Sequence, residues 1–243
     1  MAHETYIRES DSEKAFLFIH GFLGSPEHYE KFIEVIPDDY AVYNILLDGH
    51  GGSVKDFSNT SMIKWKEQVS QTIEKMSCKY KEIVICGHSM GTFFAIEESI
   101  KRPDLIKSVF LLAIPLKIFV RPSALINTMR SFFNLKNSKN ALAYKKAHSV
   151  KLNKRIWQYL GWIPRYLELF KESKNSRTAI VKMSVPCYVF MSEKDELVSI
   201  KSNEYMKNLE NVQINILHNS AHFIYSDDDY EFMINEFKRI YSL

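Results

Sequence analysis

Short apolar runs rich in β-branched and aromatic residues alternate with helical patterns along most of this 243-residue chain. Runs of this length and composition predict strands that are buried on both faces. When helices separate such strands, they form a mostly parallel, doubly wound sheet with helices on both sides. We therefore expect an α/β fold. The predicted strands are residues 15–20, 41–47, 82–86, 108–113, 186–192 and 212–217, and the predicted helices are residues 28–36, 61–76, 90–101, 201–207 and 228–241.

The alternation stops between residues 116 and 177, which we interpret as an insertion. Two apolar and aromatic helical stretches, residues 122–135 and 155–172, lie on either side of a polar, lysine-rich sequence. The insertion holds 14 Lys and Arg residues but only two acidic residues, Glu168 and Glu172, so its net charge is +12. The rest of the chain has a net charge of −9. The overall value of +3 therefore conceals a basic insertion on an acidic body.

The composition indicates one globular unit, with 46% hydrophobic and 25% charged residues. Residues 1–14 lack the apolar segment of a signal peptide, and no apolar run approaches the roughly 18 residues of a membrane-spanning helix. We therefore expect a soluble, cytoplasmic protein. The three cysteines, Cys78, Cys86 and Cys187, match no metal-site spacing and are predicted to be buried, reduced thiols.

A Gly-x-Ser-x-Gly motif follows the third predicted strand, with Ser89 between Gly87 and Gly91. A helix is predicted to begin at about Met90. This is the context of a nucleophile elbow, a strained turn in which side chains at the two glycine positions would collide with the backbone. Ser89 is therefore the candidate nucleophile; the alternative is a serine in an ordinary tight turn.

A serine hydroxyl needs a general base and a carboxylate that orients this base. Among eight histidines, His222 follows the last predicted strand and precedes the final helix, which suits the chain order Ser, Asp or Glu, His. His218 is the competing candidate. The acid should follow a strand between Ser89 and His222, and Asp195 has this position. Its neighbours Glu193 and Glu196 are alternatives that we interpret as solvated loop charges.

Acyl transfer also requires hydrogen-bond donors for the developing oxyanion. The backbone N–H of Met90, which follows the candidate nucleophile, is one predicted donor. The second is the N–H of Phe22, in the loop after the first long strand. The side chains of both residues are expected to line an acyl pocket.

Five segments together resemble the bacterial carboxylesterase and monoacylglycerol-lipase-like group of the α/β-hydrolase superfamily. They are HGFLGSP at residues 20–26, DGHG at 48–51, GHSMG at 87–91, SEKDELV at 192–198 and SAH at 220–222. The resemblance covers residues 14–115 and 178–241 and leaves out the insertion. Thr92 stands where many members have a further glycine, and the first two strands of longer members are reduced here to at most residues 5–8.

This resemblance implies an α/β-hydrolase core, residues 1–115 and 178–243, with residues 116–177 as a basic helical cap over the site. It implies a serine hydrolase of short- to medium-chain acyl esters or monoacylglycerols, acting through Ser89, His222 and Asp195 and an acyl-enzyme intermediate. The substrate would be a small-molecule ester. Neither a metal nor an organic cofactor has a role in this chemistry.

Two other functions remain open at this stage. Residues 21–25 also resemble a menaquinone-pathway lyase of the same fold, which has an arginine shortly after its elbow, whereas this chain has Thr92, Phe93 and Phe94 there. The second alternative is a non-catalytic ligand receptor. The basic residues of the insertion can form a solvated face, attract an anionic substrate or contact an anionic membrane. No nucleic-acid recognition motif accompanies the charge, so we expect no nucleic-acid partner.

Overall fold

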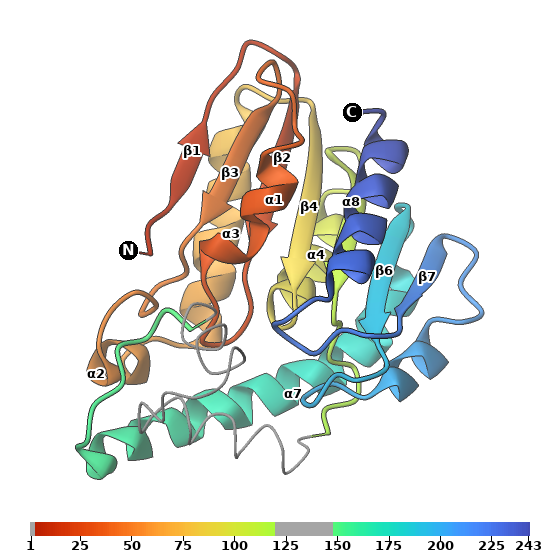
Figure 1. The fold of residues 1–243 in the computed structure, drawn as a ribbon. Helices are drawn as coiled ribbons and strands as arrows, with labels where there is room; N and C mark the ends of the chain where they lie inside the picture. The colour runs from red at the N-terminus through yellow and green to blue at the C-terminus, as the bar shows by residue number, and fades with distance from the viewer. Residues whose placement is uncertain (1–2, 120–147) are drawn as a thin grey trace.

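The computed structural model describes residues 3–119 and 148–243, and a seven-stranded sheet forms its centre (Figure 1). The strands lie in the order β1-β3-β2-β4-β5-β6-β7, and every neighbouring pair is parallel except β1 with β3. This confirms the predicted α/β fold and its mostly parallel sheet. The strands are β1 Tyr6–Arg8, β2 Lys14–Ile19, β3 Ala41–Ile45, β4 Glu82–His88, β5 Ile106–Leu112, β6 Cys187–Ser192 and β7 Val212–Leu217.

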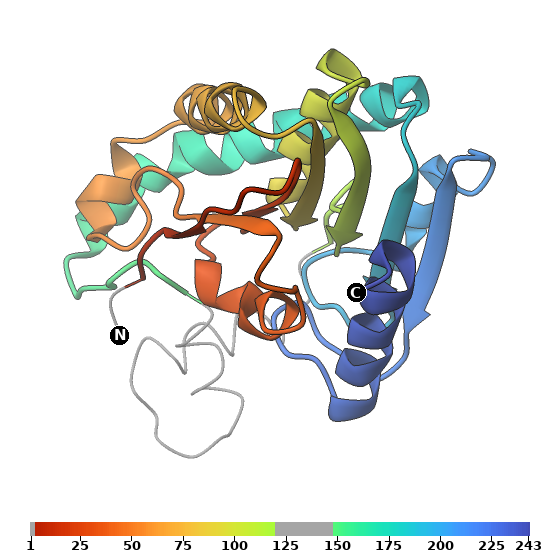
Figure 2. The same ribbon diagram turned by 90° about the horizontal axis from the view of Figure 1, so that it is seen from above.

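Helices cover both faces of the sheet. Helices α3, α4 and α7 lie on one side, and α1 and α8 lie on the other (Figure 2). The α-helices are α1 Glu30–Ile33, α2 Val54–Ser58, α3 Met62–Ser77, α4 Gly91–Lys101, α7 Ile163–Ala179 and α8 Asp227–Tyr241. Four short 3₁₀ helices are also described: η1 Pro26–Tyr29, η2 Ile156–Trp162, η3 Ile180–Lys182 and η4 Ile200–Tyr205.

The side chains of β2 explain why its sequence is apolar at every position after the exposed Lys14. Leu17 and Ile19 point into the apolar core beneath α3 and α4, whereas Phe16 and Phe18 point into the core beneath α1 and α8. Successive side chains of a strand alternate between the two faces of a sheet. Because helices cover both faces, neither set can be polar, and the strand becomes a continuous apolar run.

The structure departs from the sequence predictions mainly in the helices. Residues 201–207 contain the 3₁₀ helix η4, and the short helix α2, which Ser53 and Asp56 cap reciprocally, was not predicted. The helix expected at residues 155–172 is instead η2 followed by α7, which begins at Ile163 with Pro164 in its first turn. A proline is favoured at such a start because it lacks the N–H that an interior position would use. The helix predicted at residues 122–135 lies outside the described residues.

The predicted burial of the cysteines was correct for two of the three. Cys86 in β4 and Cys187 in β6 are buried in the sheet, whereas Cys78 is exposed at the end of α3. Burial raises the pKa of the thiols of Cys86 and Cys187. These two thiols therefore stay protonated and act as small apolar side chains.

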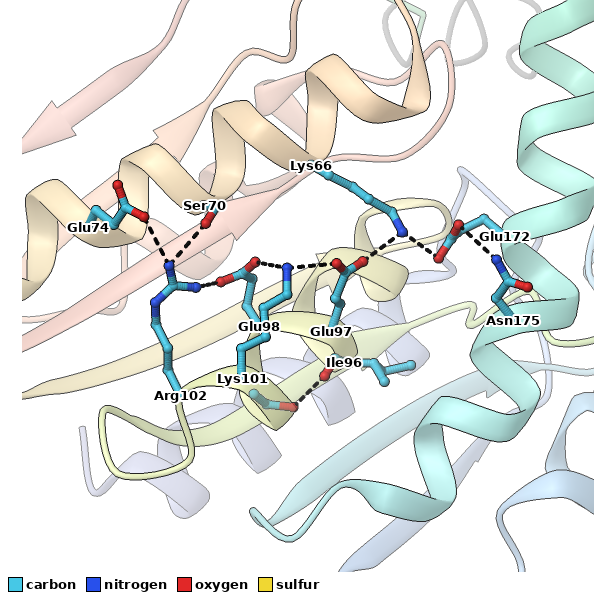
Figure 3. Close-up of polar contacts among 11 residues, drawn as sticks. Lys66, Ser70, Glu74, Ile96, Glu97, Glu98, Lys101, Arg102, Glu172 and Asn175 are labelled. Atoms are coloured by element: carbon cyan, nitrogen blue, oxygen red, sulfur yellow. Dashed lines mark hydrogen bonds and ion pairs between the residues drawn. The ribbon is translucent and has the colours of Figure 1, made fainter.

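Helix α7 is attached to the body by a chain of charged side chains (Figure 3). Lys66 of α3 bridges Glu97 of α4 (2.7 Å) and Glu172 of α7 (2.8 Å). Next to Glu172, in the C-terminal half of α7, Ser173 and Arg177 donate to the carbonyl oxygens of Pro115 and Leu116. Further members of the network are Lys101 with Glu97 and Glu98, and Arg102 with Glu98, Glu74 and Ser70.

Candidate active site

Ser89 occupies a sharp turn between β4 and α4. Its φ is +51°, a left-handed value that residues other than glycine rarely adopt. The turn is held by hydrogen bonds: the Ser89 N–H donates to the carbonyl of Leu112 (2.9 Å), and the Ser89 carbonyl accepts from the N–H and the hydroxyl of Thr92 (3.0 and 2.6 Å). Thr92 stands where the sequences that this chain resembles often have glycine, and its hydroxyl adds a hydrogen bond to the turn. The strand reaches His88, two residues beyond its predicted end.

Close backbone packing explains the glycines around Ser89. A Cβ on Gly87 would lie 2.8 Å from the carbonyl oxygen of Gly91, and a Cβ on Gly91 would collide with the carbonyl oxygen of Ile19 at the end of β2. A Cβ on Gly21 would lie 2.8 Å from the Cβ of Ser89. The loop after β2 therefore packs directly against the elbow. These geometric features are the ones that the motif predicts for a nucleophile elbow.

Asp195 and His222 form a buried pair at the carboxyl end of β6 and β7. Nδ1–H of His222 donates to Oδ2 of Asp195 over 2.7 Å. The other carboxylate oxygen of Asp195 accepts the N–H groups of Leu197 and Val198, at 2.8 and 2.7 Å. Asp195 is thereby fixed by its own loop. The imidazole presents Nε2 as its remaining, unprotonated nitrogen.

The elbow and the His222 loop meet through His88. Nε2–H of His88 donates to the backbone carbonyl of His222 (3.0 Å), and the two rings lie 4.9 Å apart. Ser89, the next residue, and His222 are both buried, with 8% and 2% of their surface exposed. No hydrogen bond joins their side chains in the described part of the chain. A catalytic contact of this kind is often long before substrate binds.

The pKa values of the buried histidines distinguish His222, which can accept a proton near neutral pH, from the others, which stay neutral. Burial alone would lower the pKa of His222, but the Asp195 carboxylate, through its charge and its hydrogen bond, raises it above 6.5. Burial lowers the pKa of His28 to about 3 and that of His20 to about 4, and it holds the pKa of His88 well below 6.5. Only His222 in this group is therefore poised to accept a proton near neutral pH.

Glu196 corrects one interpretation made from the sequence. It is 5% exposed rather than solvated, and its Oε2 accepts the backbone N–H of His222 (3.1 Å). Glu193, in contrast, is exposed, and it pairs with the exposed His218. Nothing in the residue type distinguished these two carboxylates, because their burial depends on how the loop after β6 folds against the His222 loop.

The backbone N–H groups of Phe22 and Met90, which we expect to bind an oxyanion, are not used in other hydrogen bonds among the described residues. Backbone N–H groups in protein interiors are almost always paired, so two unpaired donors beside the same serine indicate an anion-binding position. Phe22 follows Gly21, which contacts Ser89, and Met90 follows Ser89 itself.

Aromatic side chains surround Phe22 and connect it to the insertion. The ring of Phe22 lies 5.0 Å from that of Phe57 in α2 and 4.9 Å from that of Tyr166 in α7. Trp162, at the end of η2, packs against Phe57 and donates from Nε1 to the carbonyl of Val54 (3.0 Å). The last third of the insertion thus lies against the loop that follows β2.

The described residues contain no group of three or more His, Cys, Asp or Glu side chains arranged to hold a metal ion. None of the described helices combines the length and apolar composition that crossing a bilayer requires.

Curated relatives match parts of this chain. The sequence is 35% identical over 104 residues to "Probable lysophospholipase BODYGUARD 4" of Arabidopsis thaliana, a match that covers 41% of this chain and 24% of the relative. It is 23% identical over 234 residues to "Putative esterase/lipase 3" of Mycoplasma pneumoniae, covering 88% of this chain and 82% of the relative. The chain spans only about a quarter of the length of the first curated relatives that it matches.

Solved structures share the fold over nearly the whole chain. The monoacylglycerol lipase of Paleococcus ferrophilus superposes with a TM-score of 0.71 at 16% identity, covering 98% of both chains. A soluble variant of the monoglyceride lipase of Saccharomyces cerevisiae, solved with a substrate analog, gives 0.69 at 14% identity and covers 97% of this chain and 90% of that one. MenH of S. aureus gives 0.60 at 18% identity and covers 99% of both chains.

A family model described as "Serine aminopeptidase, S33" matches residues 10–229, which is most of the chain and includes the elbow, the Asp195 loop and His222. Together with the parallel sheet and the strained serine between β4 and α4, this match establishes that the chain belongs to the Hydrolase_4 family of the α/β-hydrolase superfamily.

Proposed function

We propose that this protein is a serine hydrolase that cleaves carboxylic esters through Ser89, His222 and Asp195. One observation carries the proposal: the buried hydrogen bond of 2.7 Å between His222 and Asp195, on a loop that His88 joins to the strained serine. A carboxylate that fixes the tautomer of a buried imidazole beside a serine elbow is the arrangement that nucleophilic acyl transfer needs.

The proposed reaction has two acyl-transfer steps. His222 Nε2 takes the proton of the Ser89 hydroxyl while its oxygen attacks the ester carbonyl carbon. The N–H groups of Phe22 and Met90 hold the negative oxygen of the tetrahedral intermediate. The C–O bond to the alcohol then breaks, and the proton on His222 passes to the leaving alkoxide. Water repeats the sequence on the acyl-enzyme, so that a carboxylic acid leaves and Ser89 is restored.

The proposed substrates are short- to medium-chain acyl esters or monoacylglycerols. Phe22 and the partly exposed Tyr166, whose rings lie 4.9 Å apart, supply aromatic surface at the oxyanion loop, where an acyl chain would lie. We further propose that residues 116–177 act as a cap over this site; η2 and all but the last two residues of α7 belong to that segment. The monoacylglycerol lipases of similar fold support this substrate class by analogy only.

The test combines covalent labelling with turnover. A fluorophosphonate should label Ser89, and Ser89→Ala should lose both labelling and hydrolysis of p-nitrophenyl esters and monoacylglycerols of graded chain length. Ser77→Ala, at the exposed end of α3, is the matched control and should behave as the wild type. Persistent labelling of folded Ser89→Ala protein would reject Ser89 as the nucleophile.

The two alternatives have less support. The positions after the elbow, where the menaquinone-pathway lyase has its arginine, are filled by Phe93 and Phe94, both buried in the core of this protein. They offer no charge to a substrate carboxylate. A non-catalytic receptor would bind an ester without turnover, so wild-type turnover of any p-nitrophenyl ester excludes it.

We also propose that the protein contacts anionic membranes. A row of exposed apolar side chains along η2 and α7 supports this proposal. In globular proteins large exposed apolar side chains are usually scattered singly. Here five follow one another at helical spacing along η2 and α7, next to the exposed basic residues of 151–155. They are Ile156 (77% exposed), Trp157 (67%), Leu160 (66%), Ile163 (53%) and Leu167 (63%). Apolar insertion beside basic charge is the binding mode of interfacial helices.

Vesicle binding tests this contact. Because Trp65 and Trp162 are buried, the emission of exposed Trp157 should shift to the blue on vesicles containing phosphatidylglycerol. Binding should weaken as salt shortens the Debye length from about 10 Å at 0.1 M to about 3 Å at 1 M. Leu160→Asp should bind less and still hydrolyse p-nitrophenyl acetate. Equal binding to neutral phosphatidylcholine, or no binding to either lipid, would contradict the proposed contact with anionic membranes.

A further inference from the structure

The backbone of His222 is held at both ends by buried side chains from different parts of the chain. Its N–H donates to Oε2 of Glu196 (3.1 Å), and its carbonyl accepts from Nε2–H of His88 (3.0 Å). The imidazole itself is held by Asp195. Three groups therefore fix one residue, and only Asp195 belongs to the proposed catalytic set.

Glu196 is an unusual group to use for this purpose. A buried carboxylate is costly unless it is well paired, whereas a neutral acceptor would satisfy the same backbone N–H without burying a charge. Glu196 is 5% exposed, and its second oxygen, Oε1, has no hydrogen-bond partner in the described part of the chain. The retained charge therefore requires a reason beyond the single backbone hydrogen bond.

We propose that Glu196 is a positioning residue for His222: its carboxylate fixes the N–H end of this residue opposite His88, and places a second negative charge beside the imidazole. The proposal rests on the proposed esterase function for its kinetic consequence. When His222 takes the serine proton, it becomes a cation in a buried site. Two carboxylates in place of one then stabilise that cation.

The other titratable groups that face His222 carry no charge near neutral pH. Burial lowers the pKa of His28 to about 3 and that of His148 to about 4, and it holds the pKa of His88 well below 6.5. Burial also raises the pKa of Tyr225 well above 10. Among the described residues, Asp195 and Glu196 are thus the charges that determine how readily His222 is protonated, and both raise its pKa.

Glu196→Gln separates the charge from the hydrogen bond, because the amide oxygen still accepts the N–H of His222. The variant should lower the pKa of His222 by about half a unit to one unit. The acid limb of the kcat/KM profile should move to lower pH by the same amount. Glu193→Gln, which removes the exposed carboxylate of the same loop, is the matched control and should leave the midpoint in place.

Two measurements keep the outcomes distinct. NMR titration of ¹⁵N-labelled histidines reads the pKa of His222 without turnover, so it tests Glu196 even if the protein hydrolyses no ester. A Glu196→Gln midpoint equal to that of the wild type would overturn the proposal, whatever the change in melting temperature. If Glu196→Gln does not fold, Glu196→Asp provides the test, because it keeps the negative charge. Its His222 titration should have the wild-type midpoint, and a lowered midpoint would reject the assignment.

Discussion

Lys66 of α3 and Glu172 of α7 form an ion pair of 2.8 Å between residues that are 106 positions apart in the chain. The Glu172 side chain is 11% exposed and that of Lys66 is 28% exposed. Lys66 also bonds Glu97 of α4. One ammonium group thus ties the helix of the insertion to two helices of the body.

Lys66→Met should destabilise the protein by about 1–3 kcal/mol, because it leaves a largely buried carboxylate without its partner. Urea unfolding of Lys66→Met, Glu172→Gln and the double variant would give the coupling energy. Lys81→Met, which breaks an exposed pair with Glu13, should cost at most about 1 kcal/mol. A coupling energy near zero for Lys66 and Glu172 would show that other contacts hold α7.

Asp195→Asn should lower kcat for ester hydrolysis by roughly 10³ to 10⁴. Because the N–H groups of Leu197 and Val198 hold one oxygen of residue 195, the asparagine would keep its carbonyl oxygen there and turn its NH2 donor toward Nδ1 of His222. The imidazole then carries its proton on Nε2, which no longer accepts the serine proton. Steady-state kinetics of a p-nitrophenyl ester measure the effect. If Asp195→Asn stayed active while Glu196→Gln lost all turnover, the carboxylates would have been assigned in the wrong order.

The pH profile should report the raised pKa of His222. The base must be neutral to act, and the charge and hydrogen bond of Asp195 outweigh burial and raise its pKa above 6.5. The value of kcat/KM should therefore increase with pH through a midpoint above 6.5. A profile that is already flat at pH 6 would contradict this electrostatic picture of the site.

Acid should destabilise the fold through the buried, neutral histidines. The pKa of His28 is lowered by burial to about 3, so between pH 6.5 and about 3 the unfolded chain binds a proton that the folded chain rejects. The stability contributed by this group is present above pH 6.5 and is lost as the pH falls, by up to about 1.4 kcal/mol per pH unit. His28→Gln should remove this part of the slope in unfolding measurements.

Protonation of His222 should change the stability of the fold in the opposite direction to protonation of His28. Because its pKa is raised on folding, His222 contributes stability at pH values below 6.5, and this contribution is lost as the pH rises through the folded pKa. Between pH 6.5 and the folded pKa of His222, acidification should stabilise the wild type through this residue, and His222→Gln should remove that gain. Below pH 6.5, His28→Gln should instead flatten the loss of stability on acidification. The same change in both variants would reject the assignment of charge states.

The parts of the fold set by local pattern could be predicted from the sequence. The strand runs, the elbow and the loops that bring Asp195 and His222 together each have a signature within ten residues. The start of α7 at Ile163 had an available signal in Pro164, and the capping of α2 had one in Ser53 and Asp56. The catalytic roles of these residues and the extent of the cap stay predictions.

Contacts between distant loops could not be predicted. Glu196 and His222 are 26 positions apart, and Glu196 becomes buried only because the chain between them brings the two loops together. The Lys66 network likewise requires three helices to meet, and nothing in the sequence around Lys66 indicates which carboxylates will reach it. Such features follow from tertiary packing, which the periodicity of a single segment does not encode.

The contact between Gly91 and the carbonyl of Ile19 has a consequence for the order of events in refolding. The loop that follows β2 supplies the surface against which Ser89 rests, so we expect the serine turn to reach its final geometry only when β2 pairs with β4. The rate at which Ser89 becomes reactive toward a fluorophosphonate should therefore report how fast β2 and β4 pair. After dilution from denaturant, covalent labelling should lag behind the recovery of helical signal, and the lag should lengthen in variants that slow the pairing of these two strands.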